Sequence, residues 1–268
     1  MLQYSWPILV LGVAGILNQT ADKILFPKIS TDANPLGQLA VYSACTKVAM
    51  IMAMITQAFR YAYEPFVFGK SKDSDSRDTY AKAMRYFVIF TLLVFLAVMA
   101  GIDILKFIIG EDYWSGLHVI PIVMAAEIMM GIYFNLSFWY KLTDRTIWGA
   151  YFSGIGCVVL IAINVIFVPI YGFVACAWAG FCGYGIAMLL SYFIGQKYYP
   201  IKYPLKAIGG YVLLTAAIYA VYERVTFEIM WVNVAFRAAF VLMYIGIIVM
   251  VEKKNFIHRN VTKNVIAN

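Results

Sequence analysis

The stretch FVIFTLLVFLAVMAG, residues 87–101, decides the fold of this chain. It is apolar on every side, whereas a strand of a membrane barrel alternates apolar and polar residues along its length. Lipid offers the backbone no hydrogen-bond partner, so only helices and closed barrels cross a bilayer. The stretch therefore predicts a transmembrane α-helix.

The rest of the sequence has the same character. Of its 268 residues, 63% are hydrophobic and 13% are charged, and the mean hydropathy is +0.79. A soluble domain is about 45–50% apolar, and a helix of about 20 apolar residues spans a bilayer. Eight such stretches occur, at 4–27, 37–63, 86–109, 117–140, 147–168, 172–196, 205–222 and 230–251. The composition predicts an all-α membrane protein with about eight transmembrane helices.

The positive charges predict the orientation of these helices. If the N-terminus is inside, fourteen of the 21 lysines and arginines fall at inner ends, and only Lys23, Lys28, Lys106 and Arg224 at outer ends. Cytoplasmic loops retain positive charge, so both termini are expected in the cytoplasm. This bias accounts for the net charge of +7 without a nucleic-acid partner.

Polar residues interrupt the first two helices. A hairpin loop near residue 32 places Asn18 level with Lys47, with Asp22 one helical turn above Asn18. A charge inside a membrane costs at least about 2.5–3.5 kcal/mol, so these groups need a partner or water. Two readings stay open: Asn18 and Asp22 face an aqueous cavity with Lys47, or Asp22 and Lys47 form an ion pair that neutralises itself.

The inner end of the second helix carries a second polar group. Gln57, Arg60 and Glu64 follow one helical face, and Pro65 is expected to end the helix. Arg60 can meet an anionic head group that enters from the cytoplasm, or it can extend to the interface and pair with Glu64.

Three further charged positions lie in later helices. Glu127, in the middle of the fourth helix, has no basic residue at its level on the third, which suggests a distant partner or a protonatable coupling residue. Asp103 and Lys106 are three residues apart and should pair, whereas Arg237 should extend outward to the interface.

Smaller polar and packing signals complete the pattern. The inner half of the fourth helix carries polar residues that either line a path or hydrogen-bond to other helices, namely Tyr133, Asn135, Ser137 and Tyr140.

Pro169 and Gly172 predict a tight turn. The small residues Ala175, Ala179 and Gly183 then repeat every four residues, which favours close helix packing.

Enzyme signatures are missing from the sequence. The four cysteines lie in apolar helices without CxxC spacing, and no HExxH, GxSxG or glycine-rich phosphate loop occurs. The DSD of residues 73–75 could mimic a metal-binding DxD motif, but a loop of mixed charge is usually solvated. We expect no enzyme activity, no metal site and no cofactor.

Three stretches together resemble a known family. NQTADKILF at 18–26, YSACTKVAMIMAMITQAFRYAYEPFVF at 42–68 and NVIFVPIYGFVACAWAG at 164–180 resemble the C-terminal half of polysaccharide flippases. These flippases, of the O-antigen type, belong to the multidrug/oligosaccharidyl-lipid/polysaccharide exporter superfamily. The resemblance covers most of residues 1–200. It implies a six-helix lobe at 1–200, two additional helices and a cytoplasmic tail at 201–268, and a missing or separately encoded N-terminal half.

The resemblance also implies a function. Such proteins move an undecaprenyl-pyrophosphate-linked oligosaccharide across the bacterial inner membrane by alternating access, for lipopolysaccharide or exopolysaccharide synthesis. By position, the substrate-binding residues are Lys47, Arg60, Asn18 and Gln57, and the coupling residues are Asp22 and Glu127. Besides the lipid-linked oligosaccharide, membrane lipids are expected partners.

Three alternatives remain open. The first is a drug/cation antiporter of the same superfamily. The second is a membrane enzyme of polyprenyl-sugar assembly, although the outer connections are too short for large catalytic loops. The third is a structural subunit that does not transport by itself.

Overall fold

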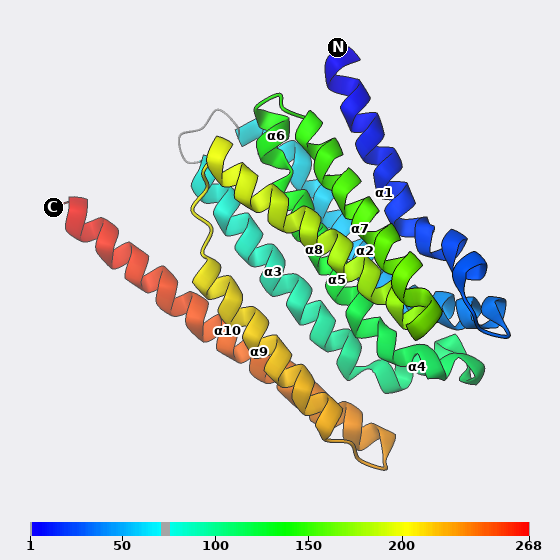
Figure 1. Cartoon of the computed structure of the whole chain (residues 1–268). Helices are drawn as coiled ribbons and strands as arrows, with labels where there is room; N and C mark the ends of the chain where they lie inside the picture. Colours follow the sequence, from blue (N-terminus) through cyan, green and yellow to red (C-terminus); the bar gives the residue numbers. More distant parts are fainter. Residues whose placement is uncertain (1, 71–75, 268) are drawn as a thin grey trace.

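Every element that the structure describes is a helix (Figure 1). This computed structural model describes the backbone of residues 2–70 and 76–267, and the side chains from Thr20 to Lys254 within these ranges together with a few earlier ones. In chain order the α-helices are α1 (Leu2–Ile29), α2 (Pro35–Lys70), α3 (Ser76–Ala100), α4 (Ile102–Ile109), α5 (Ile120–Leu136), α6 (Phe138–Leu142), α7 (Ile147–Tyr171), α8 (Phe173–Tyr198), α9 (Leu205–Arg224) and α10 (Met230–Ala267), and a 3₁₀ helix η1 (Glu111–Val119) lies between α4 and α5.

The helices confirm a multi-pass membrane protein. Among the described residues, seven helical segments are long and apolar enough to cross a membrane, and they correspond to the second to eighth expected spans. The first expected span corresponds to α1, a helix of 28 residues. Because lipid cannot satisfy the backbone, each apolar run closes its hydrogen bonds within its own helix.

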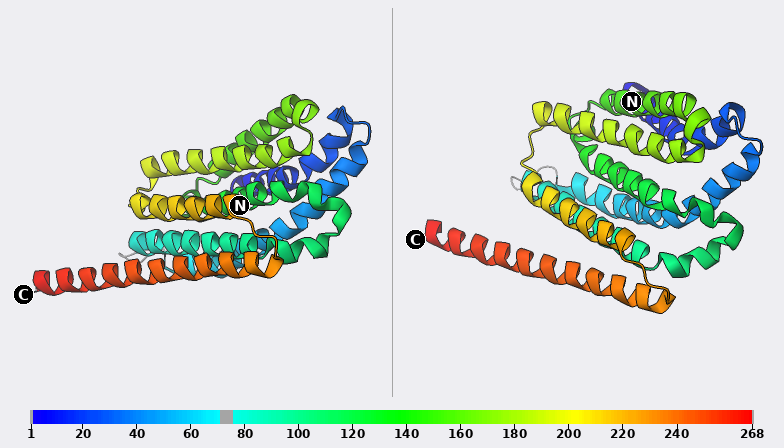
Figure 2. Two further views of the ribbon diagram at one scale, coloured as in Figure 1. Left: turned by 90° about the horizontal axis from the view of Figure 1, so that it is seen from below. Right: turned by 60° about the horizontal axis from the view of Figure 1, so that its bottom comes forward.

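The helices pack side by side as an elongated bundle. In Figure 1, α1 runs beside α7 at one edge, and α9 and α10 lie along α3 at the opposite edge. Between these edges, α8 packs on α7 and α5, and α2 packs on α5 and α3. Figure 2 shows that the C-terminal part of α10 extends beyond the other helices. The polar residues of α1 and α2 therefore lie at some distance from α9 and α10.

The contact between α7 and α8 confirms the predicted packing of small residues. A Cβ atom added to Gly156 of α7 would lie 2.9 Å from the carbonyl oxygen of Gly183 in α8, so the two backbones touch. Ala179 is fully buried on the same stripe. Gly172 makes the turn between these helices with a φ of 58°, a conformation that side chains disfavour.

Two helix boundaries differ from the sequence prediction. The third span begins earlier than expected, at Ser76, and Gly101 divides it into α3 and α4. Pro65 lies inside α2, so the expected end of the helix at this proline is wrong. Pro65 and Tyr61 are both exposed close to the C-terminal end of α2, where water can bind the carbonyl that the proline leaves free.

The α7–α8 contact generates a prediction about stability. Gly156→Ala should lower stability by about 1–3 kcal/mol, because the new methyl group meets backbone that cannot turn aside. Gly154→Ala is the matched control on the same helix, since a Cβ there meets nothing within 4 Å. Thermal unfolding of the purified protein in detergent should show a lower Tm for the first variant only. Equal Tm values for the two variants would contradict this packing.

Candidate substrate and coupling site

Asp22 lies on the side of α1 that faces α2. Its carboxylate accepts the backbone N–H of Lys23 at 2.8 Å and lies within hydrogen-bonding reach of the Tyr42 hydroxyl. Tyr42 is only 4% exposed, and its ring packs near Phe173 of α8. The partner of Asp22 on α2 is therefore a tyrosine.

Glu127 reaches the same region from α5. Tyr184 of α8 lies close enough to interact electrostatically with both Glu127 and Asp22, and Tyr42 interacts with Tyr184. Glu127 has no ion pair within the described part of the chain. Asp22, Tyr42, Glu127 and Tyr184, on α1, α2, α5 and α8, form what we call the carboxylate cluster. Both expected coupling residues interact with Tyr184, but no hydrogen bond or ion pair among the described residues joins them to each other.

Lys47 lies on another face of α2. It is five residues from Tyr42, which is about 140° around the helix axis. Lys47 is exposed, next to Met50 and Met54, which are 55% and 72% exposed. It forms no ion pair with a carboxylate that the structure describes, so the expected Asp22–Lys47 pair is absent.

Arg60 belongs to a separate group in the C-terminal half of α2. Its Nε atom lies 3.8 Å from a Glu64 oxygen, and its guanidinium stacks 4.4 Å from the ring centre of Phe134 in α5. Lys141 binds the other Glu64 oxygen at 2.6 Å. One carboxylate thus lies between two cations, which leaves a net positive charge. The pairing of Arg60 with Glu64 that the sequence suggested is confirmed.

The structure does not bring Arg60 and Lys47 together. Thirteen residues separate them, which places them about 20 Å apart along α2 and about 140° apart around it. Gln57 is half-buried one turn before Arg60. The side chain of Asn18, also expected to bind substrate, lies outside the described residues, as do Asp73–Asp75 of the DSD sequence.

The polar residues at the C-terminal end of α5 and in α6 bond partly within α5 and partly to other helices. Asn135 donates to the Gly131 carbonyl at 3.0 Å and Ser137 donates to the Phe134 carbonyl at 2.6 Å, and both carbonyls belong to α5. The Tyr133 hydroxyl donates to the Gly149 carbonyl at 3.3 Å and lies 3.1 Å from the Ser153 hydroxyl, both on α7. Tyr140 donates to the Tyr133 hydroxyl at 3.4 Å. All of these side chains are buried, which supports hydrogen bonding between helices over an open polar path.

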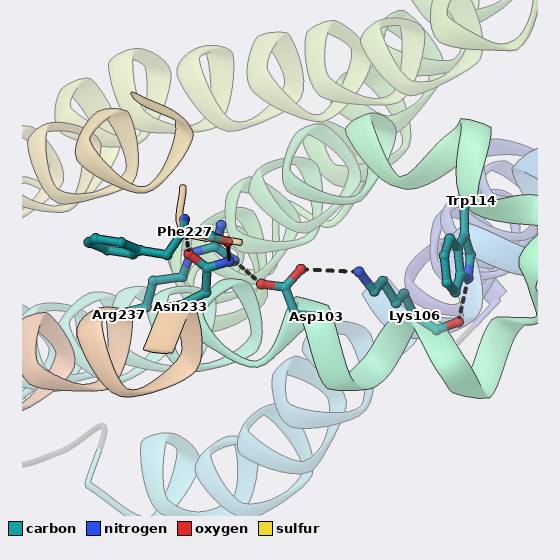
Figure 3. A network of polar contacts seen from close by, with 6 residues as sticks. All are labelled: Asp103, Lys106, Trp114, Phe227, Asn233 and Arg237. Atoms are coloured by element: carbon teal, nitrogen blue, oxygen red, sulfur yellow. Dashed lines mark hydrogen bonds and ion pairs between the residues drawn. The ribbon is translucent and has the colours of Figure 1, made fainter. Parts of the chain in front are cut away.

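The outer charges give one confirmation and one correction. Asp103 and Lys106 pair at 3.4 Å, as the spacing predicted. Arg237 does not extend outward: it is 8% exposed and its Nη1 atom lies 3.1 Å from Asp103 (Figure 3). An arginine buried beside lipid requires an anionic partner, and α4 supplies one. Neither charge contacts the carboxylate cluster.

The two half-buried carboxylates can bind a proton or a cation, and the exposed lysine can bind an anion. Sequence reasoning missed Tyr42 and Tyr184. Counting residues from the hairpin loop near residue 32, which placed Asn18 level with Lys47, also places Tyr42 level with Asp22. No feature of the sequence indicates Tyr184.

Comparisons with known proteins show the fold. The sequence matches no protein-family model and no curated protein. Among solved structures, the chain is similar to the MATE transporter VcmN of Vibrio cholerae in its bent form, with a TM-score of 0.65 and 14% sequence identity. The superposition covers 91% of this chain and 64% of that one, so this chain spans less than two thirds of the transporter's length. At this identity the likeness establishes a shared fold with a membrane transporter.

Proposed function

We propose that this chain is the C-terminal part of a transporter of the multidrug/oligosaccharidyl-lipid/polysaccharide exporter superfamily. Its substrate is an undecaprenyl-pyrophosphate-linked oligosaccharide, which it moves across the bacterial inner membrane by alternating access. Both termini lie in the cytoplasm, and an N-terminal half completes the transporter. The sequence resemblance to polysaccharide flippases supports the substrate, and the fold shared with a MATE transporter supports the mechanism.

The exposure of Lys47 is the observation that carries this proposal. Lys47 lies twelve residues into α2, about 18 Å along the helix, which is too deep for its side chain to reach the outer interface. A lysine that faced lipid at this depth would be costly. The face of α2 around Lys47 therefore borders a water-filled cavity or another part of the transporter. A fixed cation there can hold a pyrophosphate whose lipid tail remains in the bilayer.

The carboxylate cluster supports coupling. Asp22 on α1 and Glu127 on α5 both interact with Tyr184, and Asp22 also lies within hydrogen-bonding reach of Tyr42. Binding a proton or a metal cation neutralises such a pair, and this can shift the balance between two arrangements of the helices. In this proposal the driving ion binds at the cluster and the substrate binds at the Lys47 face.

A drug/cation antiporter is the second candidate, and a specific observation favours it. The face that carries Lys47 is otherwise apolar, with Met50 and Met54 exposed, and methionine-rich surfaces adapt to varied apolar ligands. Efflux of a fluorescent cationic dye, measured in cells without polysaccharide genes, distinguishes the two functions. Dye efflux that depends on this chain would favour the antiporter.

The substrate assignment predicts a charge requirement at position 47. In the bacterium that encodes the chain, Lys47→Ala should reduce surface polymer roughly tenfold or more, because a charge-assisted hydrogen bond contributes about 1.5–3 kcal/mol. Lys47→Arg should restore most of the polymer. Lys82→Ala, which removes an exposed cation at the inner end of α3, is the control. Normal polymer in the Lys47→Ala strain would remove Lys47 from the binding site.

The coupling assignment predicts a different defect. In liposomes that contain the assembled transporter, Asp22→Asn or Glu127→Gln should abolish the response of substrate translocation to an imposed proton or sodium gradient. Binding of undecaprenyl pyrophosphate should stay within about twofold, because neither carboxylate lies on the Lys47 face. Glu111→Gln, at an exposed position of η1, is the control. A gradient response that survives both substitutions would exclude the cluster from coupling.

A further inference from the structure

Helices α9 and α10 are attached to the bundle chiefly through α3. Each of them contacts α3 more extensively than it contacts the other (Figure 2). The apolar part of this attachment is narrow: Ile218 and the rings of Tyr211, Tyr222 and Tyr244 are buried in the core that includes α3, but only 11% of the apolar span of α10 and 22% of that of α9 are buried, against 61% for α3. Inside a membrane no hydrophobic effect drives helices together, so association depends on close packing and on polar contacts between them. Polar contacts therefore have a large share in positioning these two helices.

An outer ion pair joins α10 to α4 (Figure 3). The Nη1 atom of Arg237 lies 3.1 Å from Oδ2 of Asp103, whose other oxygen faces Lys106 at 3.4 Å. The Tyr222 hydroxyl of α9 donates to the Arg237 carbonyl at 2.8 Å, which ties both helices to the same point. We call Asp103, Arg237 and Tyr222 the outer latch.

The turn between α9 and α10 is fixed next to this latch. The side chain of Asn233 accepts the N–H of Phe227 at 2.7 Å and donates to the Phe227 carbonyl at 2.8 Å. These bonds close the turn within the hairpin itself. The α9–α10 hairpin thus has its own internal restraint at the outer end, independent of the bundle.

An inner ion pair joins the same helices at the other end. Arg85 of α3 pairs with Glu252 of α10, and the Tyr211 hydroxyl of α9 donates to Glu252 at 2.6 Å. Arg85 also donates to the Tyr211 hydroxyl at 3.3 Å. These three residues, the inner latch, join α3, α9 and α10 in one contact.

The two latches lie at opposite faces of the membrane. Arg85 and Asp103 are eighteen residues apart, about 27 Å along the helical chain, which is close to the thickness of a hydrocarbon core. The two ion pairs have opposite polarity: α10 contributes the basic residue, Arg237, to the outer latch and the acidic residue, Glu252, to the inner latch. A shift of α10 by one turn would separate both pairs. The latches therefore fix the register of the hairpin.

We propose that the α9–α10 hairpin is a latched arm that can part from α3 as a unit while the remaining helices keep their arrangement. The irregular segment 199–204 between α8 and α9 serves as its hinge. Lys106 binds the other oxygen of Asp103, so this carboxylate keeps a cationic partner when Arg237 moves away. Parting of the arm opens a lateral seam along α3 toward the bilayer. This inference does not depend on the substrate.

Distance measurements between spin labels test this arm. With the four cysteines replaced by alanine, nitroxides at the exposed positions Phe90 of α3 and Leu242 of α10 report the arm, and nitroxides at Phe90 and Val158 of α7 report the bundle. Arg85→Gln combined with Arg237→Gln should broaden the Phe90–Leu242 distance distribution about twofold and lengthen its mean, because both latches are lost. The Phe90–Val158 distribution should not change.

A charge exchange supplies the matched control. Arg85→Glu alone should broaden the Phe90–Leu242 distribution, and adding Glu252→Arg should narrow it again, since the inner pair re-forms with reversed charges. This pair of variants also replaces the double glutamine variant if that protein does not fold. A Phe90–Leu242 distribution that stays narrow without the latches would overturn the proposal. Equal broadening of the Phe90–Val158 distribution would do the same, since the whole bundle would then have loosened.

Discussion

Lipid cannot hydrogen-bond or solvate a polar group, and the structure depends on this constraint. The backbone meets it by forming helices almost throughout. The charged side chains meet it in three ways: by ion pairs between helices, by contact with buried tyrosines, or by exposure on a face that, in our proposal, borders water. Arg237 exemplifies the first, Glu127 the second and Lys47 the third. The functional proposals follow from the last two.

Different parts of the molecule are held together by different interactions. The α7–α8 pair is held by direct backbone contact between glycines, without any charge. The carboxylate cluster lies where α1, α2, α5 and α8 converge, so small movements of these helices alter the surroundings of Asp22 and Glu127. At the far edge, charges and hydroxyl groups hold α9 and α10, and a small share of their apolar surface is buried. Direct backbone contact thus holds the helices beside the cluster, whereas polar contacts have a larger part at that edge.

Much of the fold could be predicted from the sequence, because hydropathy and helix length depend on local residues alone. The Asp103–Lys106 pair could be predicted for the same reason, since spacing along one helix determines it. Partners on other helices could not. Counting residues from the hairpin loop placed Asp22 at about the right depth relative to α2. The rotation of α2 about its own axis, which the count does not give, determines that Tyr42 and not Lys47 faces Asp22. Arg237 was misplaced because its partner lies 134 positions earlier in the chain. Pro65 was misread because its exposure near a helix end tolerates a missing hydrogen bond.

The position of Arg237 also bears on how the protein is made. Membrane helices enter the bilayer in the order of synthesis, and an arginine without an anionic partner opposes insertion, by about 2.5–3.5 kcal/mol at the middle of the bilayer and by less toward its faces, where Arg237 lies. Its neutralising carboxylate, Asp103, belongs to a segment synthesised well before α10. Arg237 of α10 thus finds its anionic partner in a segment that is already present when α10 is made. This pair therefore favours insertion of α10 after α4.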